Sequence, residues 1–161
     1  NGTGECLICR MLEEERNFKD RVLFENEDFT VVLPFFTEYP YGAYIIDRSH
    51  KQNLVQFSDR EKDNLARAFR RTVGMLDSLY DKPFPYMMCM YQNPVNSGDY
   101  SDIYHFHIEF FPPMRSDVKQ KFNASSETGA WAHCNPTVPE EKAEELRAAY
   151  GRFIEKDNKR Q

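Results

Sequence analysis

The sequence lacks long apolar runs and any excess of positive charge. Its uninterrupted apolar stretches, such as Val31-Val32-Leu33, are far too short to cross a bilayer, so no membrane-spanning segment is expected. The 161 residues carry 21 Lys and Arg against 26 Asp and Glu, a formal net charge of −5. An acidic chain has no bulk electrostatic affinity for nucleic acid or for anionic lipid. We therefore expect no nucleic-acid partner and no membrane partner.

Cysteine and histidine are scarce, with four residues of each. The chain starts at Asn1 with no initiator Met and no charged-then-apolar leader, so we expect a cytoplasmic setting and a preceding segment outside this sequence. In a reducing compartment the four Cys predict metal ligands or free thiols and argue against a disulfide framework. Internal repeats and low-complexity tracts are also absent. The length then predicts a single domain over residues 1–161.

Hydrophobic periodicity predicts several short strands and two long helices. Strands are expected over residues 21–25, 29–33, 42–47, 86–91 and 103–111, and helices over residues 6–15, for about two dozen residues after Ser58, and after Thr137. The pairs Ser58 with Glu61 and Thr137 with Glu140 have the spacing of capping boxes. The strand 86–91 is apolar enough to be buried, and Cys89 within it is expected to be a core thiol and not a nucleophile. A segment without clear period, residues 114–136, predicts a functional loop, and the charged tail 156–161 is expected to fray.

Polar and apolar side chains alternate along the expected strand 103–111. The polar set is His105, His107 and Glu109, and the apolar set is Phe106, Ile108 and Phe110. Alternate side chains of a strand share a face, so two imidazoles and a carboxylate line one surface. Such a set needs hydrogen-bond partners or a chemical role. Both a hydrogen-bonded, half-exposed strand face and a functional surface fit this pattern.

Cys6 and Cys9 form a Cys-x₂-Cys pair, whose spacing lets two thiolates bind one tetrahedral ion. A redox pair and two buried thiols of a helix fit the same spacing. Zinc needs two further ligands, and His50 at a strand exit and His105 are available. Together Cys6, Cys9, His50 and His105 predict a closed structural zinc site that ties the N-terminal segment to two separate strands.

The order of these motifs resembles the histidine-triad (HIT-like) superfamily. The resemblance implies an α+β fold, an antiparallel sheet with a long helix packed on it, and the four zinc ligands just named. Triad hydrolases carry a third His where this chain has Glu109, whereas residues 104–109 are similar to the corresponding strand in the second half of galactose-1-phosphate (hexose-1-phosphate) uridylyltransferases. Residues 110–116, 126–129 and 139–147 are similar to that half as well.

This resemblance implies a C-terminal half of an enzyme of galactose metabolism. The family passes a uridylyl group from UDP-glucose to a histidine and then to galactose 1-phosphate. Its nucleophile lies in a His-Pro-His segment of the first half, which this sequence does not contain, so the chain alone is not expected to be catalytic. His107 occupies the pseudo-symmetric position and is the candidate nucleophile within this chain. In members with a second metal, residues at His107 and Glu109 bind it, but a further His aligns with Gln92, which puts that metal in doubt.

The same resemblance assigns a role to the loop after the Pro112-Pro113 turn. In the family dimer this segment reaches the neighbouring subunit's active site, so Lys121 and Phe122 would approach the sugar phosphate and Glu127 would accept hydrogen bonds from sugar hydroxyls. Lys121 as a solvated charge and Glu127 as a loop acceptor is the other interpretation. The implied partners are a UDP-hexose, a hexose 1-phosphate, the N-terminal half of the enzyme and a second copy in a homodimer.

Two other functions fit the same motifs. A free-standing histidine-triad nucleotidyl hydrolase or transferase would use His107 as its own nucleophile. A non-catalytic binding module would keep the fold without the chemistry.

Overall fold

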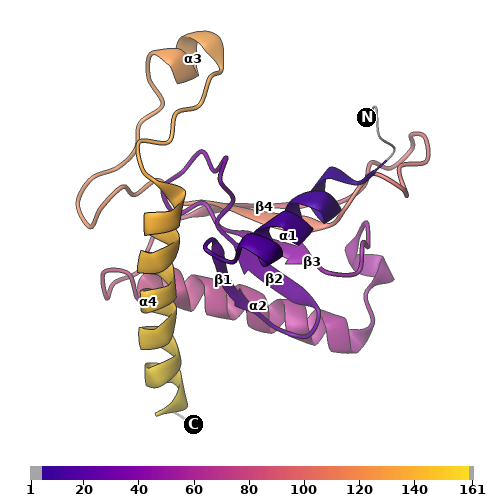
Figure 1. Ribbon diagram of the computed structural model, residues 1–161, viewed down its shortest axis with the longest axis horizontal. Helices are drawn as coiled ribbons and strands as arrows, with labels where there is room; N and C mark the ends of the chain where they lie inside the picture. The colour runs from indigo at the N-terminus through magenta and orange to yellow at the C-terminus, as the bar shows by residue number, and fades with distance from the viewer. Residues whose placement is uncertain (1–4, 160–161) are drawn as a thin grey trace.

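A five-stranded antiparallel sheet organises the chain in the computed structural model, which describes residues 5–159 (Figure 1). In spatial order its strands are β1 (Val22–Glu25), β2 (Phe29–Val32), β3 (Tyr44–Asp47), β5 (His107–Phe111) and β4 (Met87–Tyr91). Each neighbouring pair is antiparallel. The expected α+β fold with an antiparallel sheet is confirmed.

Within residues 5–159 two long helices and three shorter helical segments accompany the sheet. They are α1 (Leu7–Phe18), the 3₁₀ turn η1 (Leu54–Gln56), α2 (Asp59–Asp77), α3 (Ser126–Ala130) and α4 (Pro139–Asn158). The helix α2 begins at the predicted capping box, in which Ser58 Oγ accepts from the Glu61 N–H and the Glu61 carboxylate accepts from the Ser58 N–H. No helix within residues 5–159 is long and apolar enough to cross a membrane.

Different helices cover the two faces of the sheet (Figure 1). The main core joins one face to α2 and α4. It includes Phe29, Val31, Ile45, Ile108 and Phe110 of the sheet with Leu65, Leu76, Ala143 and Leu146 of the two helices. On the other face Met11 and Leu12 of α1 pack against Val32 and Ile46. The helix that carries the Cys-x₂-Cys pair is therefore anchored to the sheet by its own apolar contacts.

The His-x-His strand is shorter than its alternation predicts. β5 begins at His107, since residues 101–103 form a turn and residues 104–106 belong to no strand. His105 therefore precedes the strand and is buried, whereas His107 and Glu109 are half-buried on the face opposite the main core. The prediction that all three polar side chains share one strand face is correct only for His107 and Glu109.

β4 is an edge strand, and none of its five residues is buried. The prediction of a buried strand over residues 86–91 is therefore wrong. So is the prediction that Cys89 is a core thiol, because Cys89 is exposed. Within residues 5–159 one edge of β4 pairs with β5 and the other has no partner strand.

The start of α4 differs from its predicted capping box. Val138 is the N-cap residue, and no side chain caps the helix, although Pro139 lies in the first turn as expected. The Thr137 hydroxyl donates instead to Asn135 Oδ1 at 2.6 Å. The short helix α3, by contrast, lies in a segment where the sequence predicted only a loop. At the other end α4 includes residues 156–158 of the expected frayed tail, and residues 160–161 lie outside the described part.

Candidate functional site

Four potential metal ligands from three distant segments form one cluster. They are Cys6, Cys9, His50 and His105, and their ligand atoms all lie within 4.8 Å of one another. Cys9 Sγ lies 3.0 Å from His50 Nδ1 and 3.3 Å from His105 Nδ1. Cys6 Sγ lies 3.8 Å from His105 Nδ1. In a tetrahedral zinc site, with Zn–S of about 2.3 Å and Zn–N of about 2.0 Å, ligand atoms are about 3.5 Å apart. The donors and their spacing therefore fit a tetrahedral divalent ion.

Local structure brings each ligand to the cluster. Cys6 is the N-cap residue of α1, so Cys9 follows in the first helical turn and both thiols point to the same end of the helix. His50 follows the end of β3 with a positive φ of 53°, a conformation that non-glycine residues rarely adopt outside special sites. His105 lies two residues before β5. The cluster thus connects α1 to the ends of two neighbouring strands.

Backbone carbonyls fix the orientation of both histidine rings. His50 Nε2 donates to the Ser101 carbonyl oxygen at 2.8 Å, and His105 Nε2 donates to the Asp47 carbonyl oxygen at 2.6 Å. With the proton on Nε2, each ring turns the lone pair of Nδ1 toward the thiols. Metal-binding histidines characteristically have such a partner on the second nitrogen.

The surroundings of the cluster favour uncharged ligands when no cation is present. Burial, with the nearby Cys6 thiol as a second cause, raises the pKa of the Cys9 thiol to about 12. Burial also lowers the pKa of His105 below its usual range. A bound divalent cation reverses the effect on the thiols because it stabilises thiolates directly.

His107 lies on the same sheet face as α1, outside the four-ligand cluster. Its ring stacks between Tyr91, at a centroid distance of 4.8 Å, and Tyr44, at 6.1 Å. His107 Nδ1 donates to the His105 carbonyl oxygen at 2.8 Å, and Nε2 lies 3.2 Å from Glu109 Oε1. The imidazole is therefore held rigidly, and the nitrogen that would attack phosphorus contacts a carboxylate.

Within residues 5–159 the four-ligand cluster is the only group of three or more Cys, His, Asp and Glu side chains arranged to hold a metal. The pair His107 and Glu109 acquires no third ligand of this kind. Gln92, at the position of the additional family histidine, accepts from the Leu54 N–H through Oε1 at 3.1 Å.

The predicted hexose-phosphate loop forms an arm that carries α3 away from the sheet (Figure 1). The Lys121 ammonium and the Glu127 carboxylate are ion-paired in this arm, and both side chains are buried. Glu127 also accepts from the N–H groups of Ala124 and Cys134, each at 3.2 Å. Phe122, in contrast, is exposed. The Glu127 carboxylate is thus engaged by Lys121 and by two backbone N–H groups of the arm.

Sequence reasoning missed the groups that support these side chains. The carbonyls of Asp47 and Ser101 orient the ligand histidines, and Tyr44 and Tyr91 enclose His107. Backbone carbonyls leave no mark in a sequence. Asp47, which is fully buried, could have been noticed from the sequence because it is a charged residue at the end of an apolar strand.

The chain resembles uridylyltransferases along nearly its whole length. Residues 1–154 match the family described as galactose-1-phosphate uridyl transferase, C-terminal domain. A relative from Thermotoga maritima named galactose-1-phosphate uridylyltransferase is 43% identical over 143 residues, which are 89% of this chain and 44% of the relative. A relative of the same name from Rattus norvegicus is 30% identical over 150 residues, 91% of this chain and 39% of the relative. The chain therefore spans less than half the length of these relatives.

Solved structures give the same result for the fold. A structure titled as that of uridylyltransferase superposes with a TM-score of 0.86 at 31% identity and covers 95% of this chain and 48% of its own. A zinc-bound histidine triad family protein from Mycobacterium smegmatis superposes with a TM-score of 0.58 at 15% identity, a likeness of fold alone. The chain belongs to the family of galactose-1-phosphate uridyl transferase C-terminal domains.

Proposed function

We propose that this chain is the C-terminal half of a UDP-glucose–hexose-1-phosphate uridylyltransferase of galactose metabolism. The family match over residues 1–154, together with relatives that are more than twice as long, is the observation that carries this proposal. The reaction would pass a uridylyl group through a histidine in a preceding half that contains a His-Pro-His segment. The present chain would supply scaffold, a metal centre and a sugar-phosphate arm.

The metal centre would be a structural zinc site with Cys6, Cys9, His50 and His105 as its ligands. Two thiolates and two imidazoles are the donors of closed structural zinc sites, and these four side chains would occupy all four coordination positions of the ion. A bound zinc ion supplies folding free energy. The four side chains would fasten the start of α1 to the loop after β3, which carries His50, and to the loop before β5, which carries His105.

The nucleophile would lie outside this chain, and His107 would have a supporting role. Its Nε2 lies 3.2 Å from Glu109 Oε1, so the carboxylate occupies the position that an attacked phosphorus atom would need. A fixed ring stacked between Tyr44 and Tyr91 is nonetheless what a free-standing nucleotidyl transferase would need. That observation keeps His107 as the nucleophile of the alternative function.

The arm would bind the hexose 1-phosphate with Lys121, Phe122 and Glu127 across a homodimer interface. Lys121 and Glu127 are ion-paired with each other here, so a sugar phosphate would have to break this pair and bind both side chains itself. The substrates would be a UDP-hexose and a hexose 1-phosphate. The free cysteines suit a cytoplasmic setting.

Transfer of a labelled uridylyl group tests the proposal directly. The chain alone, and the longer protein in which a His-Pro-His half precedes it, would each be incubated with UDP-glucose labelled at the α-phosphate. We expect an acid-labile phosphoramidate on the longer protein only. Label on the chain alone, lost in His107→Asn, would support the free-standing transferase. Binding of UDP-glucose by both forms without any label would support a non-catalytic module.

A further inference from the structure

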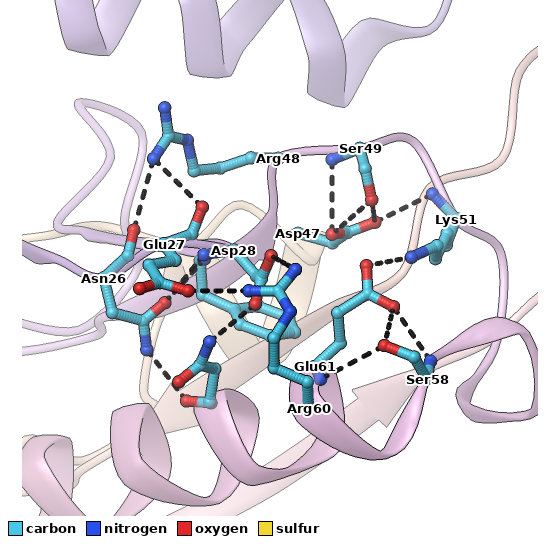
Figure 2. Close-up of polar contacts among 12 residues, drawn as sticks. Asn26, Glu27, Asp28, Asp47, Arg48, Ser49, Lys51, Ser58, Arg60 and Glu61 are labelled. Atoms are coloured by element: carbon cyan, nitrogen blue, oxygen red, sulfur yellow. Dashed lines mark hydrogen bonds and ion pairs between the residues drawn. The ribbon is translucent and has the colours of Figure 1, made fainter.

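Asp47 is a buried carboxylate at the end of β3, and its side chain organises the loop that carries His50 (Figure 2). Oδ1 accepts from the Ser49 N–H at 3.2 Å and from the Ser49 hydroxyl at 3.0 Å. Oδ2 lies 3.2 Å from the same hydroxyl and accepts from the Lys51 N–H at 2.8 Å. These bonds fall on the residues immediately before and after His50. The carboxylate thereby fixes the turn in which His50 adopts its positive φ.

The same residue also holds the other histidine of the cluster. The Asp47 backbone carbonyl accepts from His105 Nε2 at 2.6 Å. A second hydrogen bond joins the segment that carries His105 to the loop that carries His50: the Phe106 N–H donates to the Lys51 carbonyl oxygen at 2.7 Å. Asp47 therefore acts on both histidines, through its side chain on His50 and through its backbone on His105.

Cationic side chains near Asp47 are engaged elsewhere (Figure 2). The Lys51 ammonium is paired with Glu61, which also accepts from the Ser58 hydroxyl. The Arg48 guanidinium donates to the carbonyl oxygens of Asn26 and Glu27. Within residues 5–159 the hydrogen-bond donors to the Asp47 carboxylate are thus neutral. A buried carboxylate without a cationic partner favours a cation in its neighbourhood.

We propose that Asp47 is a positioning residue of the metal centre. Its carboxylate presets the His50 loop, its carbonyl fixes the His105 ring, and its charge favours a divalent cation over an empty site. This inference rests on the proposed zinc site and adds to it the residue that preorganises both imidazoles.

Zinc affinity, measured by competition with a chromophoric chelator, tests the proposal. Asp47→Asn removes the charge and places an amide N–H₂ opposite N–H and O–H donors, so we expect zinc binding about 10- to 100-fold weaker. Asp28→Asn is the matched control. The Asp28 carboxylate is half-buried and accepts from Arg60 at 2.9 Å and Asn64 at 2.7 Å, but it makes no hydrogen bond to residues 49–51. Its zinc affinity should stay within about threefold of the unmodified chain, since the partners of the Asp28 carboxylate are Arg60 and Asn64 and not a candidate ligand or its neighbours.

Cobalt substitution separates positioning from a general loss of stability. The visible absorption of Co²⁺ reports tetrahedral Cys and His coordination, and we expect it to weaken or shift in Asp47→Asn and to stay unchanged in Asp28→Asn. If Asp47→Asn does not fold, Ser49→Ala replaces it, because Ser49 is exposed and its hydroxyl makes contacts to both carboxylate oxygens. Zinc affinity and cobalt spectrum unchanged in the folded variant would overturn the role of Asp47. Failure of the unmodified chain to bind zinc would instead overturn the zinc site itself.

Discussion

Cys6 is the more buried of the two candidate thiolate ligands, with 6% of its surface exposed. Cys6→Ser replaces a zinc-binding sulfur with a hydroxyl, which is a poor ligand for zinc. We expect near-stoichiometric zinc in the unmodified chain, loss of that zinc in the variant, and a free energy of unfolding lower by about 4 kcal/mol or more. Elemental analysis of the purified protein and urea unfolding measure the two effects.

Cys89→Ser is the control for that experiment because Cys89 is an exposed thiol outside the cluster. Its zinc content and unfolding midpoint should match those of the unmodified chain. An unchanged zinc content in Cys6→Ser would remove the proposed site.

Single residues show what the sequence could and could not predict about the cluster. The four residues of the cluster were identifiable as candidate ligands because their chemistry and their spacing are both visible in the sequence. The geometry of the cluster could not be predicted, because His105 lies before β5 and its ring is fixed by a backbone carbonyl. Cys89 was misplaced in the core because an apolar neighbourhood in the sequence does not distinguish an interior strand from an edge.

Among the elements, the arm that carries α3 has a pH-sensitive contact. The hydrogen bond from Lys121, and those from the N–H groups of Cys134 and Ala124, lower the pKa of Glu127 from 4.5 to about 2. A lowered folded-state pKa contributes stability above pH 4.5 that is lost as the pH falls toward 2. We therefore expect the arm to lose order across that window. Trp131, the only tryptophan and the residue that ends α3, reports this loss as a fall in fluorescence anisotropy.

Glu127→Gln removes the titrating group and is the control for the arm. Its tryptophan anisotropy should already be low at neutral pH and should show little further decrease on acidification. A variant whose acid profile coincides with that of the unmodified chain would mean that other carboxylates govern the arm.

The two predicted capping boxes show how far local patterns specify an element. Both have the same spacing, but only Ser58 and Glu61 form the reciprocal bonds, whose loss costs about 1 kcal/mol. At the other site the Thr137 hydroxyl bonds to Asn135, so α4 starts one residue later. A short polar side chain can satisfy several nearby backbone and side-chain groups, and the sequence does not say which it selects.

On the scale of the whole molecule, the antiparallel sheet with a long helix packed on it followed from the family resemblance, whereas the exposure of β4 did not. The apolar sequence of β4 predicts burial, but none of its residues is buried in this chain. The chain spans less than half the length of these relatives, and in the proposed assembly another part of the enzyme would cover β4. Burial predicted from the sequence would then apply to the assembled protein, and the same residues can be exposed when one part of it is taken alone.

Metal removal tests how the cluster holds the molecule together. Chelation would release the start of α1 and the loops around His50 and His105, because the proposed ion would join three segments that are far apart in the sequence. The rest of α1 keeps its contacts from Met11 and Leu12 to the sheet, and α2 keeps its cap and its core face. Hydrogen exchange with and without chelator should therefore speed up at residues 6–10, 48–52 and 101–106 and change little in α2 and α4. Uniform acceleration across α2 and α4 would show that the ion supports the entire fold, and no acceleration at the three segments would show that it supports none of them.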